Sequence, residues 1–156
     1  MAQAQWLAVS LGYLLYDFFV CLFIEDDITT HLHHIASICG LVLGSIYRKG
    51  GAELLLCLFI AEATNPMQHM HYIMKELKYK GPLANLNDLL FAIIFFVARM
   101  CFGPVLVWRT VNSPTSPLFV KISGVALEVV SVFWFTKIYK IFMYKIGKGG
   151  PRRKKD

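Results

Sequence analysis

Long apolar runs separated by short polar segments make up most of the chain, and we expect each run to be a helix. Residues 6–24 are apolar except for Asp17 and match the roughly 20 residues that cross a hydrocarbon core. Residues 32–46 form a shorter run, which is also compatible with a re-entrant or buried segment. The pattern predicts five candidate transmembrane spans, over residues 6–24, 32–46, 52–66, 86–108 and 118–143.

Composition supports placement in a bilayer. Of 156 residues, 56% are hydrophobic and 14% aromatic, which is more apolar surface than a soluble domain of this size can bury. The polar segments between the runs are too short to hold a second domain. We therefore predict an all-α, multi-pass transmembrane helix bundle over residues 1–144, followed by a basic tail over residues 145–156.

Charge is distributed as expected for a membrane protein. The net charge is +6, but the basic residues lie at span ends and in the tail, so we expect no nucleic-acid partner. Lys and Arg are enriched on the cytosolic side of membranes, which predicts a cytosolic tail. With five spans, the loop carrying Lys75, Lys78 and Lys80 would share that side.

Ionisable residues inside the apolar runs are the best candidates for function, because such groups are costly in a membrane. His33 and His34 follow Asp17 by one span. Glu62, Asn65 and His69 would share one face of a continuous helix. Asp88 and Arg99 would lie along one stripe of a later helix, and the small residues around Glu128 (Gly124 and Ser131) indicate that Glu128 faces the bundle.

Each of these residues has a structural alternative. Arg99 with Asp17, Asp88 or Glu128 could form a buried ion pair that only fixes helix register. His33 and His34 are harder to explain in this way, because a carboxylate beside an imidazole suits general-base chemistry. The chain has five histidines, but their spacing does not favour a metal site, and none is predicted. The four cysteines are interpreted as small buried hydrophobes.

The order of several short motifs resembles the TLC domain, the membrane fold of ceramide synthases and several lipid-associated proteins. The resemblance rests on Gly12-Tyr13-Leu14-Leu15-Tyr16-Asp17, His33-His34-Ile35-Ala36-Ser37-Ile38, Gly51-Ala52-Glu53, Ala61-Glu62-Ala63-Thr64-Asn65-Pro66, Asn87-Asp88-Leu89-Leu90-Phe91 and Val97-Ala98-Arg99. It is greatest with small TLC proteins that carry an E-x-T-N-P motif. Family members usually have roughly two further spans before the first one here, so the chain looks short at its N-terminus, like a truncated isoform or an incomplete gene model.

The resemblance implies two functions. One is a protein of membrane lipid homeostasis that binds lipid within the bundle without catalysis. The other is an acyltransferase acting on a sphingoid base or another lipid amine, with acyl-CoA as the donor substrate and no cofactor. His33, His34, Asp17 and Glu62 would then be catalytic, and Asn65, His69, Asp88 and Arg99 would contact the substrate. Because ceramide synthases have an aspartate where this chain has Asn65, the non-catalytic function is favoured.

Partners and location follow from the same features. We expect membrane lipids as ligands, and possible homo- or hetero-oligomers formed through the transmembrane helices. The tail ends Arg152-Arg153-Lys154-Lys155-Asp156 and resembles a dibasic retrieval signal, although a basic membrane flank explains it equally well. Together with the family resemblance, this predicts an integral protein of the endoplasmic reticulum membrane.

Overall fold

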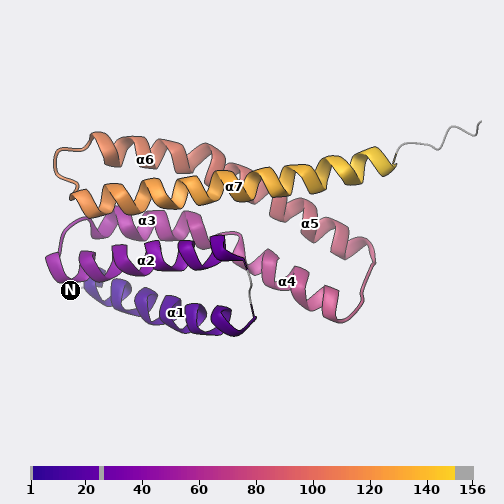
Figure 1. Ribbon diagram of the computed structural model, residues 1–156, viewed down its shortest axis with the longest axis horizontal. Helices are drawn as coiled ribbons and strands as arrows, with labels where there is room; N and C mark the ends of the chain where they lie inside the picture. The colour runs from indigo at the N-terminus through magenta and orange to yellow at the C-terminus, as the bar shows by residue number, and fades with distance from the viewer. Residues whose placement is uncertain (1, 25–26, 150–156) are drawn as a thin grey trace, which may run out of the picture.

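The computed structural model describes residues 2–24 and 27–149, and side chains within residues 4–23 and 27–144. Throughout this part of the chain the secondary structure is helical, without strands. The helices run back and forth in five passes (Figure 1). This arrangement confirms the predicted all-α helix bundle.

The passes are built from seven α-helices and one π-helix. The first pass is α1 (Ala2–Ile24), the second is α2 (Ile28–Tyr47), and the last is α7 (Leu118–Gly149). The third pass contains α3 (Gly51–Glu62) and α4 (Asn65–Glu76), and the fourth contains α5 (Pro82–Phe95), η1 (Phe96–Phe102) and α6 (Gly103–Asn112). In Figure 1, α4 and α5 form a hairpin that extends beyond α1, α2 and α3 at one end of the bundle, where α7 also extends.

Among the residues that the structure describes, three passes contain helices that are long and apolar enough to cross a membrane, over Ala4–Phe23, Pro82–Asn112 and Leu118–Tyr144. The second pass is a helix of 20 residues, so the predicted segment 32–46 lies inside a longer helix. The third pass is interrupted at Ala63 and Thr64, and each of its helices has 12 residues. A continuous helix through Glu62 and His69 was therefore a wrong expectation.

Local sequence explains several helix ends. Asp27 caps α2, because its carboxylate accepts a hydrogen bond from the Thr29 amide at 3.0 Å. Gly50 precedes α3 with a φ of 70°, a backbone conformation that glycine adopts without strain. Pro66 and Pro82 occupy the first turns of α4 and α5, where a missing backbone N–H leaves no hydrogen bond unmade. α7 continues to Gly149, beyond the predicted domain end at residue 144.

The π-helix η1 carries Arg99 near its centre. Pro104 is the second residue after it, and a proline has no backbone N–H to bond the carbonyl four residues earlier, which here belongs to Met100. A wider helical turn is a common response to such a gap, and π-helical turns are frequent at functional sites. The π-helix also shifts the register of the fourth pass, so that Arg99 is buried between α3 and α7.

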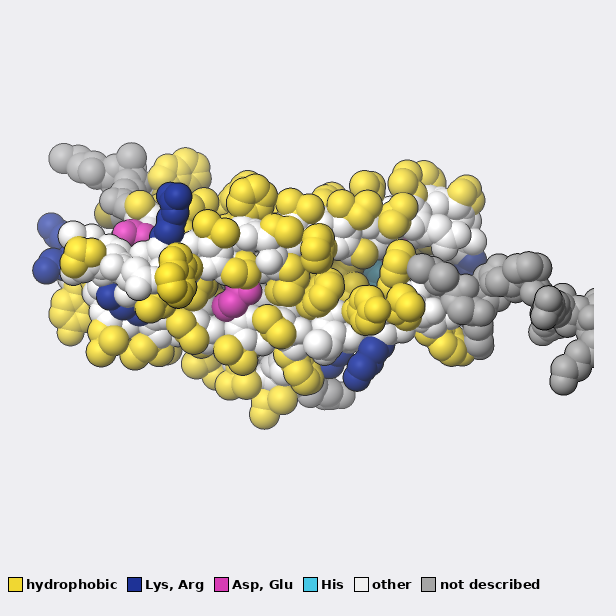
Figure 2. Space-filling view, turned by 90° about the horizontal axis from the view of Figure 1, so that it is seen from above, with side chains coloured by type: hydrophobic (Ala, Val, Ile, Leu, Met, Phe, Trp, Pro, Cys, Tyr) yellow, Lys and Arg dark blue, Asp and Glu magenta, His cyan; other side chains and the backbone are white. Residues whose placement is uncertain are grey.

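The core is small and apolar, and it lies where α1, α2, α3 and α7 meet. Its buried members are Leu7, Leu14, Leu41, Leu54 and Val120. Apolar side chains also cover much of the outer face in Figure 2, while lysine and arginine side chains lie at its left end and toward its right. An apolar exterior with charges toward the ends suits a bundle surrounded by lipid.

Candidate functional site

His33 and His34 lie side by side on α2, in the second turn of that helix, and each imidazole faces a different carboxylate. Their side chains are only 5% exposed. Nε2 of His33 is 3.7 Å from Oε1 of Glu62, and Nε2 of His34 is 3.5 Å from Oδ2 of Asp17. The structure therefore brings together the four residues that the sequence predicts as a catalytic group.

Glu62 is held in place by the break between α3 and α4. It is the last residue of α3, and Asn65 begins α4. The Asn65 amide donates a hydrogen bond to Oε2 of Glu62, and the Tyr13 hydroxyl donates to the same oxygen at 3.4 Å. Because Oε1 faces His33 while Oε2 accepts these bonds, Asn65 orients the carboxylate toward the histidine.

The second carboxylate lies on α1 beside a cysteine. Asp17 and Cys21 are one helical turn apart, and His34 approaches them from α2. The carboxylate oxygen, the thiol sulfur and an imidazole nitrogen all lie within 4.8 Å of one another. In addition, Nδ1 of His34 is buried without a hydrogen-bond partner among the described residues.

Trp134 of α7 contacts one histidine of the pair and a buried cation. The centroid of its ring is 5.3 Å from that of His33. The guanidinium carbon of Arg99 lies 5.1 Å from the same Trp134 centroid. The indole N–H donates to Oγ1 of Thr29 at 2.7 Å. Trp134 therefore contacts both the imidazole of His33 and the guanidinium of Arg99.

Arg99 is 3% exposed, and its hydrogen bonds go to neutral groups. It donates to the carbonyl of Ala61 in the last turn of α3 and to Oγ of Ser131 at 3.1 Å. Among the described residues, no carboxylate lies within ion-pair distance of Arg99. The buried ion pair weighed as an alternative in the sequence is thus not formed, and the carbonyl end of α3 helps to stabilise the cation.

Glu128 faces the bundle interior, as its neighbouring small residues predict. Together with Arg99 it lines a cavity of about 20 Å³, and its Oε1 is buried without a hydrogen-bond partner among the described residues. A Cβ atom added to Gly103 would lie 2.6 Å from Oε2 of Glu128. Glycine at this position therefore lets η1 and α6 approach the carboxylate closely.

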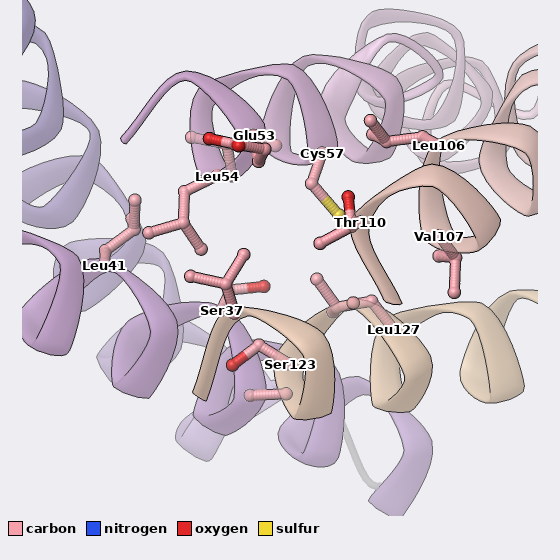
Figure 3. Close-up of a pocket in the computed structure, with 14 residues that line it drawn as sticks. Ser37, Leu41, Glu53, Leu54, Cys57, Leu106, Val107, Thr110, Ser123 and Leu127 are labelled. Carbon is pink, nitrogen blue, oxygen red and sulfur yellow. The ribbon is translucent and has the colours of Figure 1, made fainter. Parts of the chain in front are cut away.

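A second cavity lies one turn along α2 from the histidines. Its volume is about 30 Å³, and its wall is mostly apolar (Figure 3). Ser37 of α2 and Ser123 of α7 line it together, with Cys57 of α3 and Thr110 of α6. A water molecule needs roughly 10–15 Å³ of such space, so this cavity is too small for the hydrocarbon chain of a lipid.

Two residues that the sequence predicts as substrate contacts, His69 and Asp88, lie away from the histidine pair. His69 is exposed on α4. Asp88 contacts Nδ1 of His71 at 2.8 Å, and this histidine is 52% exposed. The predicted stripe of Asp88 and Arg99 does not form one surface, because η1 changes the register between them.

Comparison with known proteins identifies the family. Residues 2–140 match the TLC domain. The chain therefore belongs to the TLC domain family, and it is an integral membrane protein.

The chain is similar to a longer curated protein. The chain is 28% identical to TLC domain-containing protein 4-B of Xenopus laevis over 162 aligned residues, which cover 90% of this chain and 61% of the relative. The chain thus spans less than two thirds of the length of that protein. No solved structure was found to match the present chain.

Sequence reasoning missed two residues of the site. Cys21 follows Asp17 by four positions, a spacing that places both on one face of a helix, but it was interpreted as a buried hydrophobe. Trp134 gave no signal, because an aromatic residue in an apolar span is ordinary. Its position between His33 and Arg99 depends on how α7 packs against α2.

Proposed function

We propose that the protein binds a membrane lipid through its head group at the histidine–carboxylate site and takes part in membrane lipid homeostasis. The observation that carries this proposal is a pair of buried histidines inside a membrane bundle, each facing a partly exposed carboxylate. Charged groups at such a depth are costly unless they are paired or used. Membership of the TLC domain family supports the same proposal.

The exposed edges of the site indicate the chemistry of the head group. The side chains of Asp17 and Glu62 are 22% and 20% exposed, and Tyr13 beside them is exposed. Two carboxylates and a hydroxyl favour a lipid with a cationic amine, which can donate hydrogen bonds to both acids. Because the two cavities described above are small, we place the hydrocarbon chain along the apolar outer surface of the bundle.

Acyl transfer is the alternative function, and the chemistry of Asn65 weighs against it. An amide can orient Glu62, as the hydrogen bond between them indicates, but it cannot take up a proton. His33 with Glu62 retains the arrangement of a base and an orienting acid. The test below therefore includes an assay for transfer.

The test compares two pairs of histidines in the full chain. The protein is purified in mild detergent, and the lipids that co-purify are identified by mass spectrometry. We expect the double variant His33→Ala, His34→Ala to lose a specific lipid, while the control His69→Ala, His71→Ala in α4 retains it. The same lipid in all three samples, or in none, would contradict the proposal.

The assay for transfer uses the same samples. Each is incubated with labelled acyl-CoA and lipid amines. Binding without transfer supports the proposed function. Label in a new amide or ester that disappears in the His33→Ala, His34→Ala variant would instead establish the acyltransferase.

We propose the endoplasmic reticulum as the location, on the basis of sequence alone. The dibasic tail residues Arg153 and Lys154 lie outside the described residues. Replacing them by alanine in the full chain is expected to release the protein to later compartments, as seen by microscopy of a tagged copy. Unchanged location would leave the tail as a basic membrane flank.

A further inference from the structure

We infer that Asp17, Cys21 and His34 form a binding site for a zinc ion. Their three donor atoms come from two helices and lie within 4.8 Å of one another. Thiolate, imidazole and carboxylate are all zinc ligands in proteins, and a thiolate with an imidazole favours zinc over magnesium or calcium. The inference goes beyond lipid binding and does not rest on it.

The distance between the imidazole and the carboxylate fits two ligands of one ion. Nε2 of His34 and Oδ2 of Asp17 are 3.5 Å apart, which is longer than an ordinary hydrogen bond between such groups. Two zinc bonds of about 2.0–2.1 Å in a tetrahedral site place the bound atoms about 3.3 Å apart. The two side chains are therefore spaced for a metal between them without a shift of either helix.

The thiol needs only a small adjustment. A tetrahedral ion with a Zn–S bond of about 2.3 Å places sulfur about 3.5 Å from the nitrogen and oxygen ligands. The sulfur lies within 4.8 Å of both other ligand atoms, so it has to move by about 1 Å at most. Rotation of the cysteine side chain about χ1 is enough for this movement. Asp17 and Cys21 share one face of α1 because they are four residues apart.

Charge balance makes the site suitable for a membrane interior. The carboxylate of Asp17 and the thiolate of Cys21 together neutralise the two positive charges of the ion, while His34 binds as a neutral imidazole. Binding releases the thiol proton of Cys21 to water. The neutral complex removes the cost of an isolated carboxylate in an apolar span.

The exposure of the ligands suits entry of an ion. Asp17 and Cys21 are only partly buried, which leaves an approach for the ion, while His34 is buried. Three protein ligands leave a fourth position open for water or for an anionic ligand atom.

The test measures zinc in the full chain purified with an affinity tag that contains no histidine. After dialysis, we expect about one zinc ion per chain by mass spectrometry of the metal. Cys21→Ser and Asp17→Asn should each lower this content at least tenfold, whereas the control Cys57→Ser, in the same bundle but outside the cluster, should retain it. Equal zinc in the wild type and Cys21→Ser, or no zinc in any sample, would overturn the inference.

Cobalt provides a second readout that does not depend on how well a variant folds. Co²⁺ added to the metal-free wild type and to Cys57→Ser should produce a thiolate-to-cobalt charge-transfer band. Bound cobalt without this band would exclude Cys21 as a ligand and overturn the inference. Lipid co-purification is measured on the wild type, Cys21→Ser and Cys57→Ser, and loss of zinc with retained lipid in Cys21→Ser, a residue outside the proposed lipid contacts, separates this inference from the proposed function.

Discussion

The contact between Asn65 and Glu62 determines how the carboxylate is used. The Asn65 amide donates to one oxygen of Glu62 while the other oxygen faces His33. A hydrogen bond to a charged acceptor contributes about 1.5–3 kcal/mol when it is sheltered from water. An aspartate at this position would replace a donor by a second negative charge.

Substitutions of Asn65 should separate the loss of the hydrogen-bond donor from the gain of a second negative charge. Asn65→Ala removes the donor and is expected to lower the thermal midpoint. Asn65→Asp should lower it further at neutral pH, because like charges repel at short distance. Thermal unfolding followed by size-exclusion chromatography measures both. An Asn65→Asp variant that is more stable than the wild type would show that Asn65 does not contact Glu62.

Trp134 is expected to stabilise the site through two separable contacts. Trp134→Phe keeps an aromatic ring against His33 but removes the hydrogen bond to Thr29, which should cost about 1 kcal/mol. Trp134→Ala removes the ring as well and should cost about 3–5 kcal/mol. Chemical unfolding in detergent measures the difference, and equal losses would show that the ring contributes nothing beyond its N–H.

Residue patterns located part of the site and missed the rest for physical reasons. Asp17, His33, His34 and Glu62 stand out because ionisable groups are rare in apolar spans, and the structure brings them together. His69 and Asp88 carry the same signal but lie elsewhere. One cause is the helix break after Glu62, and the other is the π-helix that contains Arg99. Neither irregularity follows from spacing counted on an ideal helix.

At the scale of elements, the approach of α6 to α7 depends on glycine. A Cβ at Gly103 would lie 2.6 Å from Glu128, whereas one at Gly124 would meet only Val107 at 3.8 Å. Gly103→Ala should therefore displace the Glu128 carboxylate, the end of a flexible side chain, and should be less favourable than Gly124→Ala. Gly124→Ala should be neutral or stabilising by up to about 1 kcal/mol. Unfolding free energies measure both.

A double variant identifies the cause of the Gly103 effect. In a Glu128→Ala background the clash is absent, so Gly103→Ala should cost little. If its cost is the same in both backgrounds, the close approach is not limited by Glu128. The comparison is a double-mutant cycle, which isolates the interaction between the two positions.

The start of α2 is tied to α7 by an ion pair whose pH dependence can be predicted. Asp27 contacts Lys137 and caps α2. The hydrogen bond from Lys137, followed by that from Thr29, lowers the pKa of Asp27 to about 2. Because the folded pKa lies below the unfolded value, this contribution is fully present above about pH 4 and is lost as pH falls toward 2.

Asp27→Asn tests this dependence while retaining a side chain that can cap the helix. The variant should unfold at a lower temperature than the wild type at pH 7. The two midpoints should converge as the pH falls below about 4. A constant difference down to pH 2.5 would show that the ionised carboxylate does not contribute.

Helix type was predictable for every pass, while helix continuity was not. Apolar runs of sufficient length located the helices that fit a membrane, such as Leu118–Tyr144. The break at Ala63 and Thr64 was missed, because the apolar run up to Ala61 gives no sign of where α3 ends. α7 continues to Gly149, beyond the predicted span over residues 118–143, because an apolar run locates the part of a helix that fits the membrane and not its full length.

At the scale of the whole molecule, five alternating passes give a definite prediction for the two sides of the membrane. The loop between α4 and α5 and the loop between α6 and α7 lie at opposite ends of the bundle (Figure 1). The helical stretch between them, Pro82–Asn112, has 31 residues, or about 45 Å of helix, which exceeds a hydrocarbon core of roughly 30 Å. The two loops should therefore face different compartments.

Cysteine labelling tests this arrangement. In a chain whose four native cysteines are replaced by alanine, Lys80→Cys should react with a membrane-impermeant maleimide only from the cytosolic side, because basic loops favour that side. Thr115→Cys should react only from the opposite side. Labelling of both from one side would mean that Pro82–Asn112 does not cross. The histidine site would then lie in a bundle that rests on the membrane, and its carboxylates would face water rather than lipid.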